Sequence, residues 1–327
     1  MCATLALAGD TMLGRGVAER LMADPAAPLV ASEIAHWIAG ADAFVLNLEC
    51  CVSERGSRFP EPGKPFFFRA PPVAATRLAE LGVDAVALAN NHALDYGADA
   101  LLDTLAYLEA AGIAAVGAGA SEETARALRP VRCGELDLRL LSFSDHPASY
   151  AAGPNRAGIA FADLRAGLPT WVQGAVASCD GDALVVTPHW GPNMVAEPLD
   201  YVRRAAEALV AAGATLVAGH SAHVFQGAAR GVLFDLGDFL DDYAADRDLR
   251  NDLGLLWLVE LEPEGVGRVR ALPLALDYCF TRVASPAEAD WIVRRMQALC
   301  ASFGTEVDVQ EGMITLRTDG AHDLSDG

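Results

Sequence analysis

Gly219-His220-Ser221-Ala222-His223 follows directly on the apolar run 214–218. A short apolar run that ends in glycine is typical of a buried strand, and open α/β sheets bind their ligands at the ends of such strands. Two histidines three residues apart at a strand exit are therefore a candidate site. A packed pair of histidines with satisfied hydrogen bonds would explain the same five residues, so the rest of the chain decides between the two interpretations.

Polar clusters also follow other apolar runs of this chain. They are Gly9-Asp10, Asn47-Leu48-Glu49, Asn90-Asn91-His92 with Asp95, and His189-Trp190-Gly191. Carboxylates, amides and imidazoles are the groups that bind divalent metals and that transfer protons in enzymes. Several of them at strand ends predict an enzyme with a metal site and acid–base chemistry.

The apolar periodicity predicts alternating strands and helices in the first half and a strand-rich second half. Strands are expected at 4–8, 43–48, 85–89, 114–116, 131–133, 136–144, 183–187, 215–218, 232–236, 255–262 and 269–274, and helices at 17–22, 31–38, 73–81, 97–111, 199–212 and 286–303. Prolines at 60, 62, 65, 71 and 72 exclude a regular helix over 55–72 and indicate an ordered excursion that lines a site. The expected fold class is α/β, with β-sheets sandwiched between helices, in a single catalytic domain over 1–318. The polar tail 319–327 is expected to be disordered.

The charge of the chain limits its partners. A formal net charge of −20 argues against nucleic acid and against an anionic membrane surface. It favours a peptide, or another substrate that local contacts hold. The apolar runs are all shorter than the roughly 20 residues that cross a bilayer, and residues 1–8 lack a basic segment, so we expect a cytoplasmic protein. The seven irregularly spaced cysteines do not form a disulfide framework, and the oligomeric state stays open.

Taken in order, the polar clusters resemble a known family. They are Gly9-Asp10-Thr11-Met12-Leu13-Gly14-Arg15, Asn47-Leu48-Glu49, Ala89-Asn90-Asn91-His92 with Asp95-Tyr96-Gly97, His189-Trp190-Gly191, Gly219-His220 with Ala222-His223, and Leu236-Gly237-Asp238-Phe239. Over residues 3–275 the sequence resembles the CapA-type (poly-γ-glutamate capsule) family of the calcineurin-like metallophosphoesterase superfamily. The resemblance implies a four-layer α/β/β/α sandwich with a metal centre at the strand ends.

The resemblance also implies roles for individual residues. Asp10, Glu49, Asn91 and His189 match metal ligands, and His92 matches an acid/base histidine that Asp95 is placed to hold. The closing pair, His220 and His223, is assigned with Asp238 to the catalytic group. Arg15 is assigned to the binding of an anionic group of the substrate.

Two positions depart from the superfamily pattern. Met12 stands where phosphoesterases have a histidine ligand, which weakens a second metal and makes a mononuclear site credible. Asp238 stands where CapA-type sequences usually have asparagine. An added carboxylate there can form a His–Asp pair with one of the closing histidines and raise its basicity.

Structural roles compete with several of these assignments. Asp10 after a strand is also a common helix N-cap, and Asp95 is equally placed to cap the helix that begins near Gly97. Arg15 fits a plain salt bridge. The pair Asp145-His146 lies in a predicted loop, and the sequence gives only a weak indication that it belongs to the site.

Three classes of function remain open. CapA-like chains include peptide epimerases of lasso-peptide biosynthesis, and a CapA-like chain with a depleted phosphoesterase site resembles them, so the favoured hypothesis is metal-dependent L-to-D epimerisation at a peptide Cα. The alternatives are a metal-dependent hydrolase of phosphoesters or of poly-γ-glutamate amide bonds, and a metal-stabilised binding module. The ligand types allow Ca²⁺, Mg²⁺, Mn²⁺ or Zn²⁺.

Overall fold

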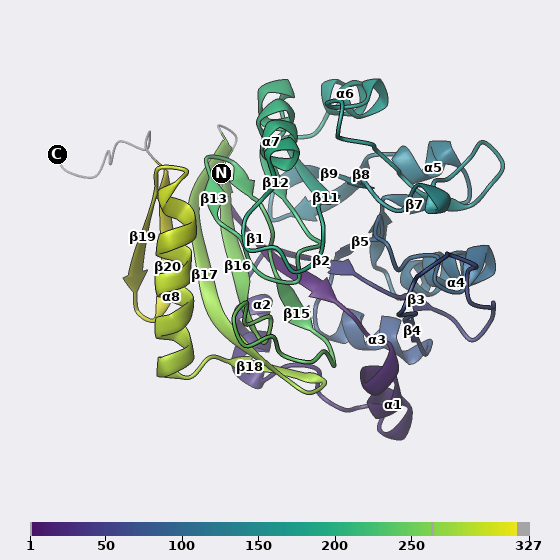
Figure 1. Cartoon of the computed structure of the whole chain (residues 1–327), viewed down its shortest axis with the longest axis horizontal. Helices are drawn as coiled ribbons and strands as arrows, with labels where there is room; N and C mark the ends of the chain where they lie inside the picture. Colours follow the sequence, from purple (N-terminus) through teal and green to yellow (C-terminus); the bar gives the residue numbers. More distant parts are fainter. Residues whose placement is uncertain (1, 263–264, 319–327) are drawn as a thin grey trace.

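The computed structural model describes residues 2–262 and 265–318, and the tail expected at 319–327 lies outside them. Two sheets occupy the middle of the molecule (Figure 1). In that view α6 and α7 lie on one side of the sheets and α1 and α3 on the opposite side. No helix in the described ranges is both long enough and apolar enough to cross a membrane.

The larger sheet has the order β19-β20-β17-β16-β1-β2-β5-β6. Its parallel strands are β1 (Ala3–Thr11), β2 (Ala43–Leu48), β5 (Ala85–Ala87) and β6 (Ala114–Val116). The antiparallel part consists of β16 (Leu253–Glu262), β17 (Gly265–Asp277), β20 (Met313–Thr318) and β19 (Thr305–Gln310), with β18 (Phe280–Val283) paired to β17. The short strand β15 (Asp238–Leu240) pairs in parallel with β1 and sets Asp10 opposite Asp238.

The second sheet has six strands in the order β13-β14-β12-β11-β9-β8. They are β13 (Ala228–Ala229), β14 (Val232–Leu233), β12 (Leu216–Ala218), β11 (Ala183–His189), β9 (Leu136–Ser144) and β8 (Arg129–Cys133). Two small pairs, β3 (Cys51–Val52) with β4 (Arg69–Ala70) and β7 (Ala118–Gly119) with β10 (Gly158–Ile159), complete the β-structure of the described residues.

Helices cover both outer faces of the two sheets. The larger sheet carries α1 (Arg15–Ala23), α2 (Ser32–Ala39), α3 (Val73–Glu80) and α4 (Gly97–Ala110), and the second sheet carries α5 (Glu122–Arg126), α6 (Thr170–Ala177) and α7 (Asp200–Ala212). A single 3-10 turn spans Ala148–Tyr150, and α8 (Pro286–Ala301) packs beside β17. This arrangement confirms the predicted four-layer α/β/β/α sandwich.

Side-chain alternation along the strands divides the interior into three cores. In β1, Leu5 and Leu7 face the second sheet, whereas Ala6 and Ala8 face the helices. In β11, Val185 packs between the sheets and its neighbours pack under α6 and α7. Because both faces of these strands are buried, they are continuously apolar, and each large side chain contributes about 1.5–3 kcal/mol of burial free energy.

The structure differs from the sequence prediction mainly in elements that are short or that contain many polar residues. The strand expected at 232–236 ends at Leu233, because the chain then turns toward the site. Helix α6 and the hairpin of β19 and β20 were not predicted. The segment 55–72 contains no helix and only the two-residue strand β4, as the prolines require.

Candidate metal centre

The polar clusters predicted from the sequence meet at one edge of the two sheets. Asp10 lies near the end of β1, and Glu49 follows β2. His189 is the last residue of β11 and forms a parallel β-bridge with His220, which follows β12. All four are at least 98% buried. The carboxyl ends of strands from both sheets thus bring these side chains together, although they are distant in sequence.

Asp10 contacts both histidines of the closing pair. Its Oδ1 lies 3.5 Å from His220 Nδ1, and its Oδ2 lies 3.2 Å from His223 Nδ1. Asn47 donates a hydrogen bond of 2.7 Å to Oδ1. The carboxylate is therefore fixed in the site, and it does not cap a helix.

The two oxygens of Glu49 also face different histidines of the site. Its Oε1 lies 4.0 Å from His189 Nε2, and its Oε2 lies 3.9 Å from His223 Nδ1. Both distances are too long for hydrogen bonds, and neither oxygen has another hydrogen-bond partner among the described residues. A buried carboxylate left in this state costs several kcal/mol unless a cation compensates it.

Asp238 completes a three-residue group with Asp10 and His223. The candidate ligand atoms of these residues lie within 4.8 Å of one another, and His223 Nδ1 is 2.8 Å from Asp238 Oδ1. The pairing of β15 with β1 places Asp238 beside Asp10. The group therefore contains two carboxylates and one imidazole, whereas Met12 offers no nitrogen ligand. The sulfur of Met12 instead accepts a hydrogen bond from the Gly14 N–H.

Buried polar atoms without hydrogen-bond partners are concentrated at this edge. Within the described ranges they include Asp10 Oδ2, both oxygens of Glu49, Asn91 Oδ1, both ring nitrogens of His189, His220 Nδ1 and Asp238 Oδ2. Native interiors leave few such atoms unpaired, and lone pairs from carboxylate, amide and imidazole are ligands of divalent metals. The donor set fits a metal centre.

The pKa shifts show an excess of negative charge in the site. Burial raises the pKa of Glu49, and the neighbouring Asp10 raises it further. Burial raises the pKa of Asp238 as well. For His223, burial opposes the charged form, but Asp238 and Glu49 outweigh it and raise the pKa. A bound cation would relieve this repulsion between carboxylates.

His92 and Asp95 form a separate hydrogen-bonded pair beside this centre. His92 Nδ1 lies 2.7 Å from Asp95 Oδ2, and both side chains are buried. Burial lowers the pKa of His92 to about 4, against the opposing effect of Asp95. The N–H of Gly97 bonds to the Leu94 carbonyl, and no side chain caps α4, so Asp95 holds His92 rather than the helix.

The loop 219–223 is held by a residue that the sequence analysis missed. Asp235 accepts hydrogen bonds from the N–H groups of Ala222 and Gly237, at 2.8 and 2.9 Å. Ser221 and His223 have positive φ angles of 115° and 59°, so the loop needs such support. Asp235 follows an apolar run just as the other site residues do, and this signal could have identified it.

Arg15 forms the kind of salt bridge that was the alternative to substrate binding. Its guanidinium forms an ion pair with Asp242, and its Cζ lies 4.9 Å from the centre of the Phe68 ring. About a third of the Arg15 side chain is exposed. Asp242, which the sequence analysis did not identify, accepts hydrogen bonds from Nε and Nη2 of Arg15, and substrate binding by Arg15 stays a prediction.

His146 lies closer to the site than its loop position indicated. Its ring centre is 5.3 Å from that of His189, and its Nδ1 is 2.5 Å from Asp145 Oδ1. Asp145 also accepts hydrogen bonds from the Tyr201 hydroxyl and the Gly191 N–H. A further His–Asp pair therefore lies at the edge of the metal centre.

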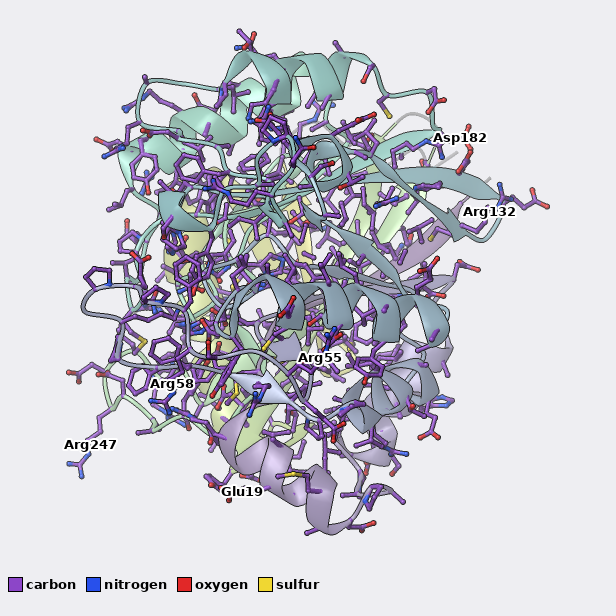
Figure 2. All side chains as sticks on the ribbon, turned by 90° about the vertical axis from the view of Figure 1, so that its right-hand side faces the viewer. Glu19, Arg55, Arg58, Arg132, Asp182 and Arg247 are labelled. Carbon is purple, nitrogen blue, oxygen red and sulfur yellow. The ribbon has the colours of Figure 1, made fainter. Side chains whose placement is uncertain are left out.

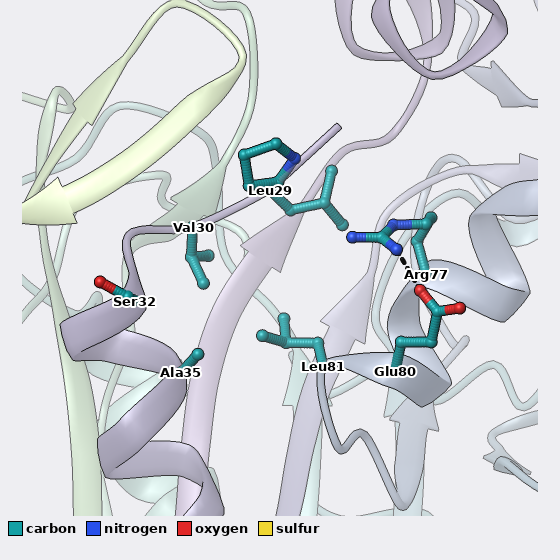
Figure 3. A pocket seen from close by; sticks show the side chains of 8 residues that line it. Leu29, Val30, Ser32, Ala35, Arg77, Glu80 and Leu81 are labelled. Carbon is teal, nitrogen blue, oxygen red and sulfur yellow. Dashed lines mark hydrogen bonds and ion pairs between the residues drawn. The ribbon is translucent and has the colours of Figure 1, made fainter. Parts of the chain in front are cut away.

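A pocket elsewhere on the molecule contains none of these residues. It lies between α2 and α3, has a volume of about 290 Å³ and is lined largely by apolar side chains beside the Arg77–Glu80 ion pair (Figure 3). Its chemistry does not match that of the strand-end site.

The chain is similar to known proteins over most of its length. Residues 4–243 match the family model described as bacterial capsule synthesis protein PGA_cap. The chain is 30% identical to a probable polyglutamine synthesis accessory protein of Mycobacterium tuberculosis, over 93% of each protein. It is 24% identical to the PGA biosynthesis protein CapA of Bacillus subtilis, over 97% of this chain and 82% of that protein.

A solved structure shares the fold. A phosphatase from Mycoplasma pneumoniae aligns with a TM-score of 0.52 at 12% identity, over 89% of this chain and 97% of the phosphatase. At this identity the similarity shows the fold alone, which is the calcineurin-like sandwich.

Proposed function

Because the chain belongs to the bacterial capsule synthesis protein family PGA_cap, we propose that it is a metal-dependent hydrolase with two adjacent metal positions. The observation that carries the proposal is the orientation of Glu49 and Asp10. Each of these carboxylates has one oxygen toward His223 and the other toward His189 or His220. Carboxylates whose two oxygens face different imidazoles would be able to hold two neighbouring cations.

Two ligand groups would hold the ions. Asp10, His223 and Asp238 form the first, and Glu49 contributes Oε2 to it. His189 and His220 would form the second, together with Glu49 Oε1, and the unpaired buried Oδ1 of Asn91 would be a further ligand. When bound, divalent ions supply Lewis-acid activation of the scissile group and compensate its developing charge. The histidine ligand missing at Met12 was the main sequence argument against a two-metal hydrolase. In this proposal the carboxylate of Asp238 replaces that ligand.

The residues of the chain provide the proton-transfer step. Asp95 occupies Nδ1 of His92, so Nε2 is the nitrogen that faces a substrate. We assign to this nitrogen, which carries no proton in that tautomer, the acceptance of a proton from the attacking water and its transfer to the leaving group as the bond to the scissile centre breaks. Asp95 fixes the ring and its tautomer, a role that a carboxylate commonly has beside a catalytic histidine.

The test is metal stoichiometry measured together with hydrolysis. Metal-free protein is titrated with Mn²⁺ and with Zn²⁺, and turnover of a phosphodiester and of a γ-glutamyl peptide is followed at each ratio. We expect two ions per chain and hydrolysis of one of the two bonds, abolished by a chelator and by Asp10→Asn. One ion per chain, or two ions without hydrolysis of either bond, would refute the proposal.

Peptide epimerisation is the second candidate, and one observation favours it. Two His–carboxylate pairs, His92–Asp95 and His223–Asp238, lie within the same site. Removal of a proton from one face of a Cα and its return on the other face requires two such groups. In this alternative His223 transfers protons instead of binding metal, one ion is bound, and the substrate is a peptide.

Isotope exchange separates the two candidates. Peptides incubated with metal-loaded protein in deuterium oxide would gain one deuteron at a Cα during epimerisation, and this gain would disappear in His92→Ala. A hydrolase would leave the Cα hydrogens unexchanged. Peptides with different C-terminal residues should be compared, because the sequence does not specify the residue.

A further inference from the structure

Lys64, the only lysine of the chain, lies largely buried beside the pair of His92 and Asp95. It lies in the proline-rich segment 55–72, and only 10% of its side chain is exposed. Its Nζ is 3.0 Å from Asp95 Oδ1 and 2.5 Å from the backbone oxygen of Asn91. A single ammonium group thus contacts both the carboxylate that holds His92 and the loop that carries a candidate metal ligand.

Asp95 is fully buried and receives four donors. Lys64 Nζ and the Tyr150 hydroxyl contact Oδ1, the latter at 3.1 Å. His92 Nδ1 and the N–H of Phe68 contact Oδ2, at 2.7 and 2.5 Å. Because both oxygens are engaged, the carboxylate has one orientation, and this orientation determines which nitrogen of His92 is hydrogen-bonded.

The same segment also contacts the ring of His92. Phe68 stacks on it with ring centres 4.1 Å apart and an interplanar angle of 28°. The N–H of Phe59 donates to the backbone oxygen of Asp95 at 2.9 Å. Residues 55–72 therefore form one wall of the site, and Lys64 is the charged contact between this wall and the catalytic pair.

We propose that Lys64 is a positioning residue that acts on His92 through Asp95. The proposal rests on the role given above to His92. Loss of the ammonium removes one of the four donors to Asp95 and leaves Oδ1 with only the Tyr150 hydroxyl, so the carboxylate is held less firmly and fixes the His92 ring and its tautomer less firmly. It also frees the Asn91 carbonyl, which loosens the loop between β5 and α4.

A double-mutant cycle tests the proposal with the metal-loaded full chain. Lys64→Met should lower kcat by about 10–100-fold with KM changed less than about threefold, the range typical of residues that orient a ligand or base. In an Asp95→Asn background the same substitution should cost little further, because the two residues act through one path. Additive losses would overturn the proposal. Lys64→Arg, which keeps the positive charge, should recover part of the rate.

Nitrogen NMR of the His92 ring gives a measurement that does not depend on turnover. The wild-type protein should show one tautomer with the proton on Nδ1, and Lys64→Met should show a mixture. An unchanged ring spectrum in Lys64→Met, with the wild-type melting temperature, would refute the proposal. If the wild type hydrolyses nothing but Lys64→Met alters the ring, the proposed function fails while the positioning role stands.

Arg58→Met is the matched control. Arg58 belongs to the same segment, is exposed and lies over the ring of Phe67 at 5.2 Å (Figure 2). It carries the same charge as Lys64 without a contact to Asp95 in the described chain. We expect wild-type kcat and a wild-type His92 spectrum. Equal losses in both variants would show that the net charge of the segment matters, and would contradict the role of Lys64.

Discussion

Asp238 shows how a single side chain changes the chemistry of the site. Its Oδ1 is bonded to His223, while Oδ2 is buried and has no hydrogen-bond partner among the described residues. Without a cation this oxygen destabilises the folded chain, because a buried unpaired acceptor loses its hydration. With a cation the same oxygen would be available as a ligand.

Asp238→Asn should therefore have opposite effects with and without metal. In metal-free protein we expect a melting temperature equal to or above that of the wild type, because a buried charge is removed. The rise in melting temperature on adding Mn²⁺ should be smaller than in the wild type, since one ligand is lost. Calorimetry of both proteins with and without the ion measures this. Equal metal-dependent rises would remove Asp238 from the ligand set.

At the scale of elements, the site depends on a close approach of β1 to the chain before β15. The N–H of Asp10 donates to the Gly237 carbonyl at 2.9 Å, and a Cβ on Gly9 would lie 1.7 Å from the same oxygen. Only glycine allows this contact. The contact in turn sets Asp10 against Asp238.

Gly9→Ala should consequently disrupt both the fold and the metal site. The clash is with backbone, so the strands must separate, at a cost of about 3 kcal/mol in the free energy of unfolding. Gly174→Ala is the control, since Gly174 lies in α6 and no described atom is within 4 Å of the added Cβ. That change should stabilise the protein by about 0.5–1 kcal/mol. Urea unfolding of both variants measures these changes. Similar stability of the two variants would contradict the close approach of β1 to the chain before β15.

The start of α8 carries a pH-dependent contribution to stability. Arg282 donates two hydrogen bonds to Glu288, and Glu288 accepts the Ser285 N–H at 2.7 Å. The Arg282 hydrogen bonds, with the help of Ser285 and against burial, lower the pKa of Glu288 to about 2. This stabilisation is fully present above the unfolded-state pKa of about 4.3 and is lost as the pH falls through about 2.

Glu288→Gln should destabilise the protein by about 1 kcal/mol at pH 7, since the pair is partly exposed and screened by solvent. The difference from the wild type should shrink between pH 4.3 and pH 3. Urea unfolding at pH 7, 4.5 and 3 measures it. A difference that stays constant over this range would show that the carboxylate charge contributes nothing.

At the scale of the whole molecule, metal binding at the candidate centre would link the two sheets. Asp10 and Glu49 belong to the larger sheet, and His189 and His220 follow strands of the second. An ion bound between them stabilises the packing of one sheet on the other, because it binds the folded chain and not separated strands.

Metal removal should therefore lower the stability of the entire domain. At a free ion concentration of about 100 times Kd, each ion contributes about 2.7 kcal/mol, which corresponds to several degrees in melting temperature. Thermal unfolding with a chelator and with added Mn²⁺ measures the shift. His36→Ala, a histidine on α2 outside the site, should show the wild-type shift. Equal melting temperatures with and without metal would contradict the assignment of the centre.

The sequence by itself determined the layered fold and most members of the site. Buried strands are continuously apolar, and the polar residues that end them are visible as interruptions, as at Asp10, Glu49 and His189. The hairpin of β19 and β20 lacks such a run, because polar and charged residues interrupt its apolar ones, and it was missed for that reason.

Only the tertiary structure decided which of these residues act together. The strand register sets Asp238 beside Asp10, the bond to Asp242 occupies Arg15, and the packing of segment 55–72 brings Lys64 to Asp95. Asp235 and His146 likewise acquire their positions from loops. Contacts between residues far apart in the chain depend on strand register and on loop packing. Neither can be predicted from residue types and local spacing in a single sequence.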